Sequence, residues 1–276
     1  PSHPGGVRHG AGGVASLPAM TSTAPAHEWP ADVRTLAVDI GGSGFKAAIL
    51  DPAGQMLTER VRVETPYPCP PERLVSSVIE LTKDLGHRDR VSVGFPGLVR
   101  NGRVRNIPSL SRSAYDGDTD PALEGAWHGF DLASALAEAF GVPTKVANDA
   151  DVQGCAVVSG EGFEFVMTLG TGVGTAMFLD GQLLPHMDAG HAPFRKGDTF
   201  EEQLGNVARK HVGNERWSQR VVEAITAYDR FLFFDTVHVG GGNAKHLDPA
   251  DLPHKARIVA NTAGIIGGVR LWDLDA

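Results

Sequence analysis

The chain has 276 residues and a formal net charge of −8, with 42% hydrophobic and 21% charged residues, so it can bury a core and is long enough for two domains. The acidic balance argues against nonspecific nucleic-acid binding, and no apolar run reaches the roughly 20 residues of a membrane span. Cys69 and Cys155 give neither a disulfide framework nor a zinc site, which fits a soluble protein of the reducing cytoplasm.

Residues 1–30 are mainly Gly, Ala, Ser, Thr, His and Pro, with few apolar anchors, and we predict a disordered tail there. The remainder is expected to divide into an N-terminal α/β domain over 31–147 and a C-terminal α/β domain over 148–276. The last helix could pack back on the N-terminal domain.

A first glycine-rich turn, DIGGSGFK at 39–46, lies between apolar runs that are typical of strands. Such a turn exposes backbone N–H groups that no side chain crowds, so it can bind phosphate. Asp39 is interpreted either as a site for a water-bridged Mg2+ ion or as an Asx-type turn residue, and Lys46 either as a phosphate contact or as an edge-strand charge. The predicted phosphate contacts are Asp39, Gly41, Gly42, Ser43, Gly44 and Lys46.

A second turn, TLGTGVGT at 168–175, repeats this plan about 130 residues later, which indicates an internal duplication. Its predicted phosphate contacts are Thr168, Gly170, Thr171 and Gly172. Two such turns can hold a chain of phosphates from both sides, which points to phosphoryl transfer.

The stretch GTGVG at 170–174 also resembles a dinucleotide-binding fingerprint, but that fingerprint needs a helix directly after the glycines. Residues 173–179 are strand formers instead, and they reach the turn signal Asp180-Gly181 too soon for a helix. A GxxxxGK[ST] pattern is absent, so a P-loop is excluded as well.

Asn148 and Asp149 follow a predicted strand over 144–147, at the end where open α/β sheets bind ligands. Asp149 is predicted either to accept the proton of a substrate hydroxyl or to N-cap a helix over 150–158. Asp151 is expected to point away from whatever Asp149 faces. The apolar spacing before this strand predicts a helix over 74–85, a buried strand over 91–95, and a helix that Asp131 caps and that runs to Phe140.

In the last third, a core helix is predicted over 217–234, a strand over 236–239 and a close-packed helix over 263–272. A third glycine turn, Gly240, Gly241, Gly242 and Asn243, would let a nucleotide approach the backbone. Four arginines, Arg100, Arg103, Arg105 and Arg112, form either a locally basic groove or a solvated loop.

Seven motifs occur in the order found in ROK-family sugar kinases, and the chain resembles that family over about residues 34–272. They are DIGGSGFK, GFPG at 94–97, VANDAD at 146–151, TLGTGVGT, GH at 190–191, VGGGN at 239–243 and NTAGIIGG at 261–268. The resemblance implies an actin-like ATPase (ribonuclease H-like) fold, in which duplicated βββαβα units form two domains around a sugar-binding cleft.

By this resemblance, Asp149 is the base that activates the 6-hydroxyl of the sugar. The implied sugar contacts are Asn106, Asn148, Asp149, Asp188, His191 and either Glu201 or Glu202, with Glu201 favoured. His191 has the alternative of a hydrogen-bonded core histidine. Asp188 stands where the family usually has Glu, and this shorter carboxylate is expected to relax discrimination between sugars that differ at C2.

The region after the GH pair lacks the cysteines of the family's zinc motif, so the chain resembles the zinc-free branch that contains the polyphosphate glucokinases. This implies Mg2+ but no zinc, inorganic polyphosphate or ATP or both as donor, and glucose or mannose as acceptor, in a monomer or homodimer. Two alternatives are an ATP-only ROK hexose or N-acetylhexosamine kinase and a non-catalytic sugar-binding ROK regulator.

Overall fold

The computed structural model describes residues 29–259 and 263–274. The predicted tail over 1–30 therefore lies, apart from its last two residues, outside the described part of the chain.

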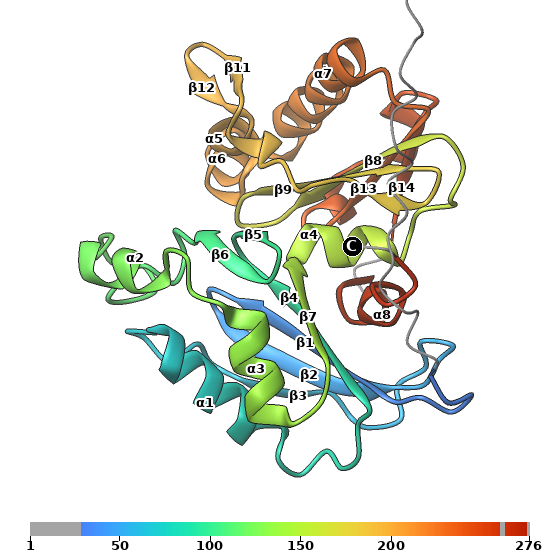
Figure 1. The fold of residues 1–276 in the computed structure, drawn as a ribbon. Helices are drawn as coiled ribbons and strands as arrows, with labels where there is room; N and C mark the ends of the chain where they lie inside the picture. The colour runs from blue at the N-terminus through green and yellow to red at the C-terminus, as the bar shows by residue number, and fades with distance from the viewer. Residues whose placement is uncertain (1–28, 260–262, 275–276) are drawn as a thin grey trace, which may run out of the picture. The chain divides into compact units, whose positions relative to one another are not determined.

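Ten strands of the described residues form two five-stranded mixed sheets (Figure 1). The first has the order β3-β2-β1-β4-β7, with β1 at Thr35–Gly41, β2 at Gly44–Leu50, β3 at Val61–Val63, β4 at Arg90–Phe95 and β7 at Thr144–Asn148. The second has the order β10-β9-β8-β13-β14, with β8 at Phe163–Leu169, β9 at Val173–Leu179, β10 at Gln182–Leu183, β13 at Thr236–Gly240 and β14 at Ala256–Ile258.

The two sheets share one topology. In each, the first three strands along the chain are antiparallel neighbours, and the next two run parallel to the first strand. The predicted α/β class and internal duplication are confirmed, with one strand in each sheet beyond the predicted βββαβα order. Residues 173–179 form strand β9, as their strand-forming side chains predict, and not the helix that a dinucleotide site needs.

Eight α-helices are described: α1 at Pro71–Thr82, α2 at Pro121–Trp127, α3 at Leu132–Phe140, α4 at Asp149–Cys155, α5 at Phe200–Leu204, α6 at Asn206–Val212, α7 at Asn214–Leu232 and α8 at Ala263–Arg270. Two short hairpins are β5 (Leu98–Arg100) with β6 (Arg103–Asn106), and β11 (Pro193–Arg195) with β12 (Asp198–Thr199). Three single-turn 3-10 helices lie at Ala189–His191, Ala244–His246 and Pro249–Asp251. None of the helices in the described ranges is long and apolar enough to cross a membrane.

Most helix boundaries follow from local chemistry. Asp131 caps α3 through Ser134 N–H, and Gly141 ends it in the left-handed region at φ 68, as predicted. The helix predicted over 74–85 lies three residues earlier, because Pro71 at its first position has its φ preset for a helix. The helix predicted over 217–234 ends at Leu232, because Phe233 takes a left-handed φ of 55.

The alternation of side chains along β1 decides where Asp39 lies. Leu36, Val38 and Ile40 belong to the core that packs against α1 and α3, whereas Ala37 packs against α8 on the other face. Because alternate residues of a strand share a face, Asp39 lies on the same face as Ala37. That is the face toward α8.

The same alternation acts in β8 of the second sheet. Phe165 and Met167 pack in the core with α7, whereas Val166 packs with Val152 and Cys155 of α4. Thr168 therefore lies on the α4 face of its sheet. Helix α4 contacts strands of both sheets and also α8, beside which it lies in Figure 1.

Helix α8 can pack this closely because two of its residues are glycines. A Cβ on Gly267 would lie 1.7 Å from the carbonyl oxygen of Val152 in α4. A Cβ on Gly268 would lie 3.1 Å from the Cβ atoms of Ala37 and Ser92 in the first sheet. The glycines of this helix, predicted as a packing device, thus bring its backbone against α4 and the sheet.

Candidate active site

The first glycine turn is the two-residue connection Gly42-Ser43 between the paired residues Gly41 and Gly44. Its carbonyls are held from outside, since the Thr65 hydroxyl donates to Gly41 O at 2.6 Å and the Tyr67 hydroxyl to Gly42 O at 2.9 Å. Within the described residues, the N–H groups of Gly42 and Ser43 meet no acceptor. They are therefore available to an anion, as predicted from the sequence.

The glycine at position 44 is required by a close approach. A Cβ there would lie 2.7 Å from the carbonyl oxygen of Val63 in β3 and 3.3 Å from the guanidinium of Arg62. A larger residue would push β3 away from the turn.

The second turn is Gly170-Thr171-Gly172, between the paired residues Leu169 and Val173. The N–H of Asn206, at the start of α6, lies 3.1 Å from the carbonyl oxygens of Gly170 and Thr171. In the part of the chain that is described, the N–H groups of Thr171 and Gly172 have no acceptor. Both predicted phosphate turns thus present unpaired donors.

The third turn, Gly240 to Asn243, lies against the second. Asn243 donates from its side-chain amide to Gly170 O at 2.9 Å and from its backbone N–H to Leu169 O at 2.9 Å. Gly241 has a left-handed φ of 85, and a Cβ on it would collide with the backbone of Leu169. Asn243, which was predicted to bind nucleotide, is 8% exposed, and its side chain binds the second turn.

Asp39 and Lys46 face each other across the first hairpin. They are register partners in β1 and β2, and the Lys46 ammonium donates to the Asp39 carboxylate at 2.9 Å. The Asx-turn alternative for Asp39 is wrong, because its carboxylate binds across the hairpin rather than to its own loop. The edge-strand alternative for Lys46 is wrong too, since β2 lies between β1 and β3.

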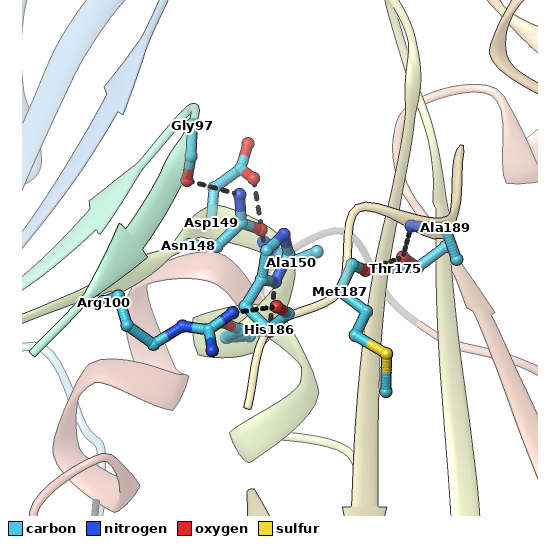
Figure 2. A network of polar contacts seen from close by, with 10 residues as sticks. Gly97, Arg100, Asn148, Asp149, Ala150, Thr175, His186, Met187 and Ala189 are labelled. Atoms are coloured by element: carbon cyan, nitrogen blue, oxygen red, sulfur yellow. Dashed lines mark hydrogen bonds and ion pairs between the residues drawn. The ribbon is translucent and has the colours of Figure 1, made fainter. Parts of the chain in front are cut away.

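Asp149 is the first residue of α4, directly after β7. The N-cap of this helix is Asn148, whose side-chain oxygen accepts the Ala150 N–H at 2.8 Å (Figure 2). The alternative that Asp149 caps a helix over 150–158 is therefore corrected: Asn148 has the extended backbone that a cap needs, and α4 ends at Cys155. The Asp149 carboxylate also accepts the Ala150 N–H, at 2.8 Å, and is otherwise uncommitted among the described residues.

Burial and, to a smaller extent, the negative charge of Asp39 together raise the pKa of Asp149 to about 7, although the hydrogen bond from Ala150 N–H opposes the shift. Gly94 of β4, the register partner of Asp39, explains the proximity. A Cβ on Gly94 would lie 3.6 Å from the Cα of Asp149, so α4 begins directly over this strand.

The second turn reaches the same helix start through Gly174. A Cβ at this position would lie 3.0 Å from the Cβ of Ala150 and 2.5 Å from the hydroxyl of Thr168. Strand β9 therefore approaches the residue that follows Asp149 without a side chain between them. Asp39, Asp149 and Thr168 thus border one region around the start of α4.

The structure connects Asn148 with Asn106 through Gly97. The Asn148 amide donates to Gly97 O at 3.0 Å (Figure 2), and a Cβ on Gly97 would lie 2.4 Å from the carbonyl oxygen of Asn106. Asn106 is exposed, whereas Asn148 is 9% exposed. Both polar atoms of the Asn148 side chain are used, since its nitrogen donates to Gly97 O and its oxygen accepts the Ala150 N–H. Of these two predicted sugar contacts, Asn106 has the freer side chain.

His191 is the last residue of the 3-10 turn Ala189–His191, and Asp188 lies just before this turn. His191 Nε2 is 3.4 Å from the Asp188 carboxylate, and their side chains are 49% and 38% exposed. The core-histidine alternative for His191 is therefore wrong. Thr175 of β9 anchors the segment, because its hydroxyl donates to Met187 O at 3.0 Å and accepts the Ala189 N–H at 3.2 Å (Figure 2).

The two candidate glutamates of α5 differ in their contacts. Glu202 forms a capping box with Thr199, in which its carboxylate accepts the Thr199 N–H at 2.8 Å. Glu201 points to the second turn instead, with its carboxylate 3.5 Å from Val173 N and directly over Gly172. A Cβ on Gly172 would collide with this carboxylate, so the glycine provides its space.

Sequence reasoning missed a buried pair beside the site. His186 Nδ1 lies 2.9 Å from the Asp151 carboxylate, and both side chains are 4% exposed. Asp151, which was expected to point away from whatever Asp149 faces, binds His186 two residues before Asp188. Of the four arginines, Arg100 and Arg103 are register partners in the β5–β6 hairpin; Arg100 donates to His186 O at 3.0 Å and Arg103 pairs with Asp131.

The sequence profile of the ROK family matches residues 35–205. Polyphosphate glucokinase of Mycobacterium tuberculosis (strain ATCC 25177 / H37Ra) is 28% identical over 267 residues, which cover 90% of this chain and 96% of that protein. The crystal structure of the inorganic polyphosphate/ATP-glucomannokinase from Arthrobacter sp. strain KM is 29% identical, with a TM-score of 0.74 over 89% of this chain and all of that one. A ROK family glucokinase from Streptomyces griseus shares the fold, with a TM-score of 0.67 at 17% identity over 86% of this chain and 98% of that one. The family profile covers more than half of the chain, and the chain therefore belongs to the ROK family, with the actin-like ATPase fold.

Proposed function

We propose that this protein is a sugar kinase that transfers a phosphoryl group from inorganic polyphosphate or ATP to the 6-hydroxyl of glucose, and also of mannose. The observation that carries the proposal is Asp149, a carboxylate whose pKa is raised to about 7 by burial and by Asp39. It lies at a helix start that the two hairpins with unpaired turn N–H groups approach through Asp39 and Gly174. A base with such a pKa is half ionised near neutral pH and can accept a hydroxyl proton. The names of the M. tuberculosis and Arthrobacter relatives support this choice of donor and acceptor.

The donor phosphates would lie between the turns at Gly42-Ser43 and Gly170-Thr171-Gly172. Four backbone N–H groups point to this role, since unpaired amides in a turn bind anionic oxygens. Lys46 adds a positive charge beside the first turn. The third turn is the proposed contact for the nucleotide of ATP, and polyphosphate would not need it.

The carboxylates fit a hydrated Mg2+ ion. Magnesium is usually held by one or two carboxylates together with waters and substrate phosphates, and Asp39 and Asp149 are near enough to interact electrostatically. No group of three or more His, Cys, Asp or Glu side chains suited to a metal cage occurs within 29–259 or 263–274, and a phosphate-bound Mg2+ requires none. We expect Asp39 to hold this ion through water, where it would neutralise charge on the phosphates.

The sugar would contact side chains on three segments. Asn106 comes from β6, Asn148 and Asp149 from the junction of β7 and α4, and Asp188 and His191 from the segment after β10. Glu201 is the proposed glutamate contact, because its carboxylate is not used in the capping box that occupies Glu202. In catalysis these residues would hold the 6-hydroxyl toward Asp149, which accepts its proton as the oxygen attacks the phosphoryl group.

A coupled assay for sugar 6-phosphate tests the proposal, with glucose, mannose and N-acetylmannosamine as acceptors and polyphosphate or ATP as separate donors. We expect turnover of glucose and mannose, and a loss of kcat of about 10²- to 10⁴-fold in Asp149→Asn with little change in sugar affinity. Asp84→Asn, on an exposed residue after α1, is the matched control.

Each alternative has its own outcome. Turnover with ATP alone would favour an ATP-only kinase, and preference for N-acetylmannosamine would favour an N-acetylhexosamine kinase. Sugar binding without turnover by any donor would indicate a non-catalytic regulator. Normal turnover in Asp149→Asn would remove this residue from the role of base.

A further inference from the structure

We propose that His186 is a positioning residue that joins the three segments carrying the sugar contacts, so that they keep their places around Asp149. This inference rests on the proposed sugar kinase function. His186 is not one of the predicted site residues, and its own ring is not expected to touch the sugar.

The first connection is to the helix that carries the base. The imidazole of His186 lies 2.9 Å from the carboxylate of Asp151, with both side chains 4% exposed, and Asp151 lies two residues after Asp149 in α4. A buried carboxylate without its partner would be strongly unfavourable, so we expect the two side chains to stay in contact. The position of His186 is thereby set relative to the first turn of α4.

The second connection is to the hairpin that carries Asn106. Arg100 of β5 donates to the backbone carbonyl of His186 at 3.0 Å (Figure 2). Strand β5 pairs with β6, and Leu98 of β5 is the register partner of Asn106 of β6. A bond from a charged donor to a backbone atom fixes the main chain at this point.

The third connection runs along the chain itself. Asp188 follows His186 by two residues, and Thr175 binds both Met187 O and Ala189 N. The chain around Asp188 is thus held by Thr175 of β9 at Met187 and Ala189, and by the contacts of His186 just before them. Loss of the imidazole would release that start while leaving the Thr175 bonds in place.

The test compares three substitutions of His186. The amide nitrogen of Asn occupies the place of Nδ1, whereas that of Gln lies one bond further out, near the place of Nε2. His186→Asn should therefore restore the bond to Asp151, and His186→Gln and His186→Ala should not. We expect the sugar KM to rise about tenfold in the Ala and Gln variants, with kcat and the donor KM within about threefold of the wild type.

A second readout does not depend on catalysis. Hydrogen exchange of the backbone amides at 187–191, measured on the full chain without sugar, should accelerate in the Ala and Gln variants and return to the wild-type rate in His186→Asn. If the protein transferred no phosphoryl group, the proposed function would fail, while this exchange and the calorimetric sugar affinity would still decide the role of His186. If His186→Ala fails to fold, the comparison of Asn with Gln suffices.

The matched control is His238→Ala. This residue forms the other buried histidine-carboxylate pair of the described residues, with Glu164 at 2.7 Å, inside the second sheet. Its loss should lower the Tm but leave the sugar KM and exchange at 187–191 unchanged. A wild-type sugar KM and exchange rate in His186→Gln, or an equal rise of KM in His238→Ala, would overturn the proposal.

Discussion

The carboxylate of Asp39 and that of Asp149 interact electrostatically, and the charge of Asp39 raises the pKa of Asp149. They come from the end of β1 and the start of α4, more than a hundred residues apart in sequence. Gly94 lies between them, as the register partner of Asp39 and directly under the backbone of Asp149. The pKa of the proposed base thus depends on its burial and on a second carboxylate that strand β1 brings to the start of α4.

The first prediction concerns pH. If Asp149 must be ionised to accept a proton, kcat/KM for glucose should be maximal above pH 7 and fall about tenfold per pH unit below its pKa of about 7. Asp39→Asn removes a negative charge that raises this pKa, so the acid limb of the pH profile should move to lower pH, whatever the variant's absolute rate. Asp84→Asn should not move the limb. An unmoved limb in Asp39→Asn would show that these two charges are not coupled.

The second prediction separates the two glutamates of α5. Glu201→Ala should raise the glucose KM about tenfold, because its carboxylate is free of the helix cap. Glu202→Ala removes one half of the capping box, so it should lower the Tm slightly and leave the glucose KM unchanged. Steady-state kinetics and thermal unfolding of both variants provide the measurement. The reverse pattern would assign the sugar contact to Glu202.

The third prediction concerns Asp188, whose exposed carboxylate lies beside His191. Asp188→Glu lengthens the side chain by one methylene and should change its contact with the C1–C2 edge of the sugar. We expect the ratio of kcat/KM for glucose to that for mannose to increase by roughly three- to tenfold, since the shift of one contact is worth about one hydrogen bond. An unchanged ratio would show that Asp188 does not discriminate between these sugars.

The fourth prediction tests the packing of α8. Gly267→Ala would place a Cβ 1.7 Å from Val152 O, so it should destabilise the fold by about 1–3 kcal/mol or more. Gly125→Ala is the matched control, because a Cβ at this exposed position in α2 meets nothing within 4 Å and should stabilise the helix by about 0.5–1 kcal/mol. Chemical denaturation measures both. Equal stability of the two variants would contradict the close contact of α8 with α4.

Much of the fold was predictable because its signals are local. The glycine turns lie between runs of strand formers, and the caps at Asp131 and Gly141 use side chains or conformations that few residues provide. The duplication could be predicted from the repeat of one turn pattern, and the matching strand orders confirm it.

The site was less predictable, because its connections join residues distant in sequence. Nothing local distinguishes Asn148 from Asp149 as the helix cap, since both side chains are good caps, and only the extended backbone of Asn148 decides. His186 and Asp151 are 35 positions apart, and no periodicity indicates that they meet. The only sign of the pair in the sequence was that Asp151 is a polar residue among neighbours that are mostly buried. The choice between Glu201 and Glu202 required the contacts of α5 with the second turn.

Helix α8 follows every strand of both sheets, yet Ile265 and Val269 on it cover Ala37 and Leu50 of the first hairpin. During synthesis, this face of the N-terminal sheet must therefore stay without its cover until residues 263–270 have left the ribosome. A nascent chain that stops before residue 263 would expose these apolar side chains, and would be a natural target for chaperones.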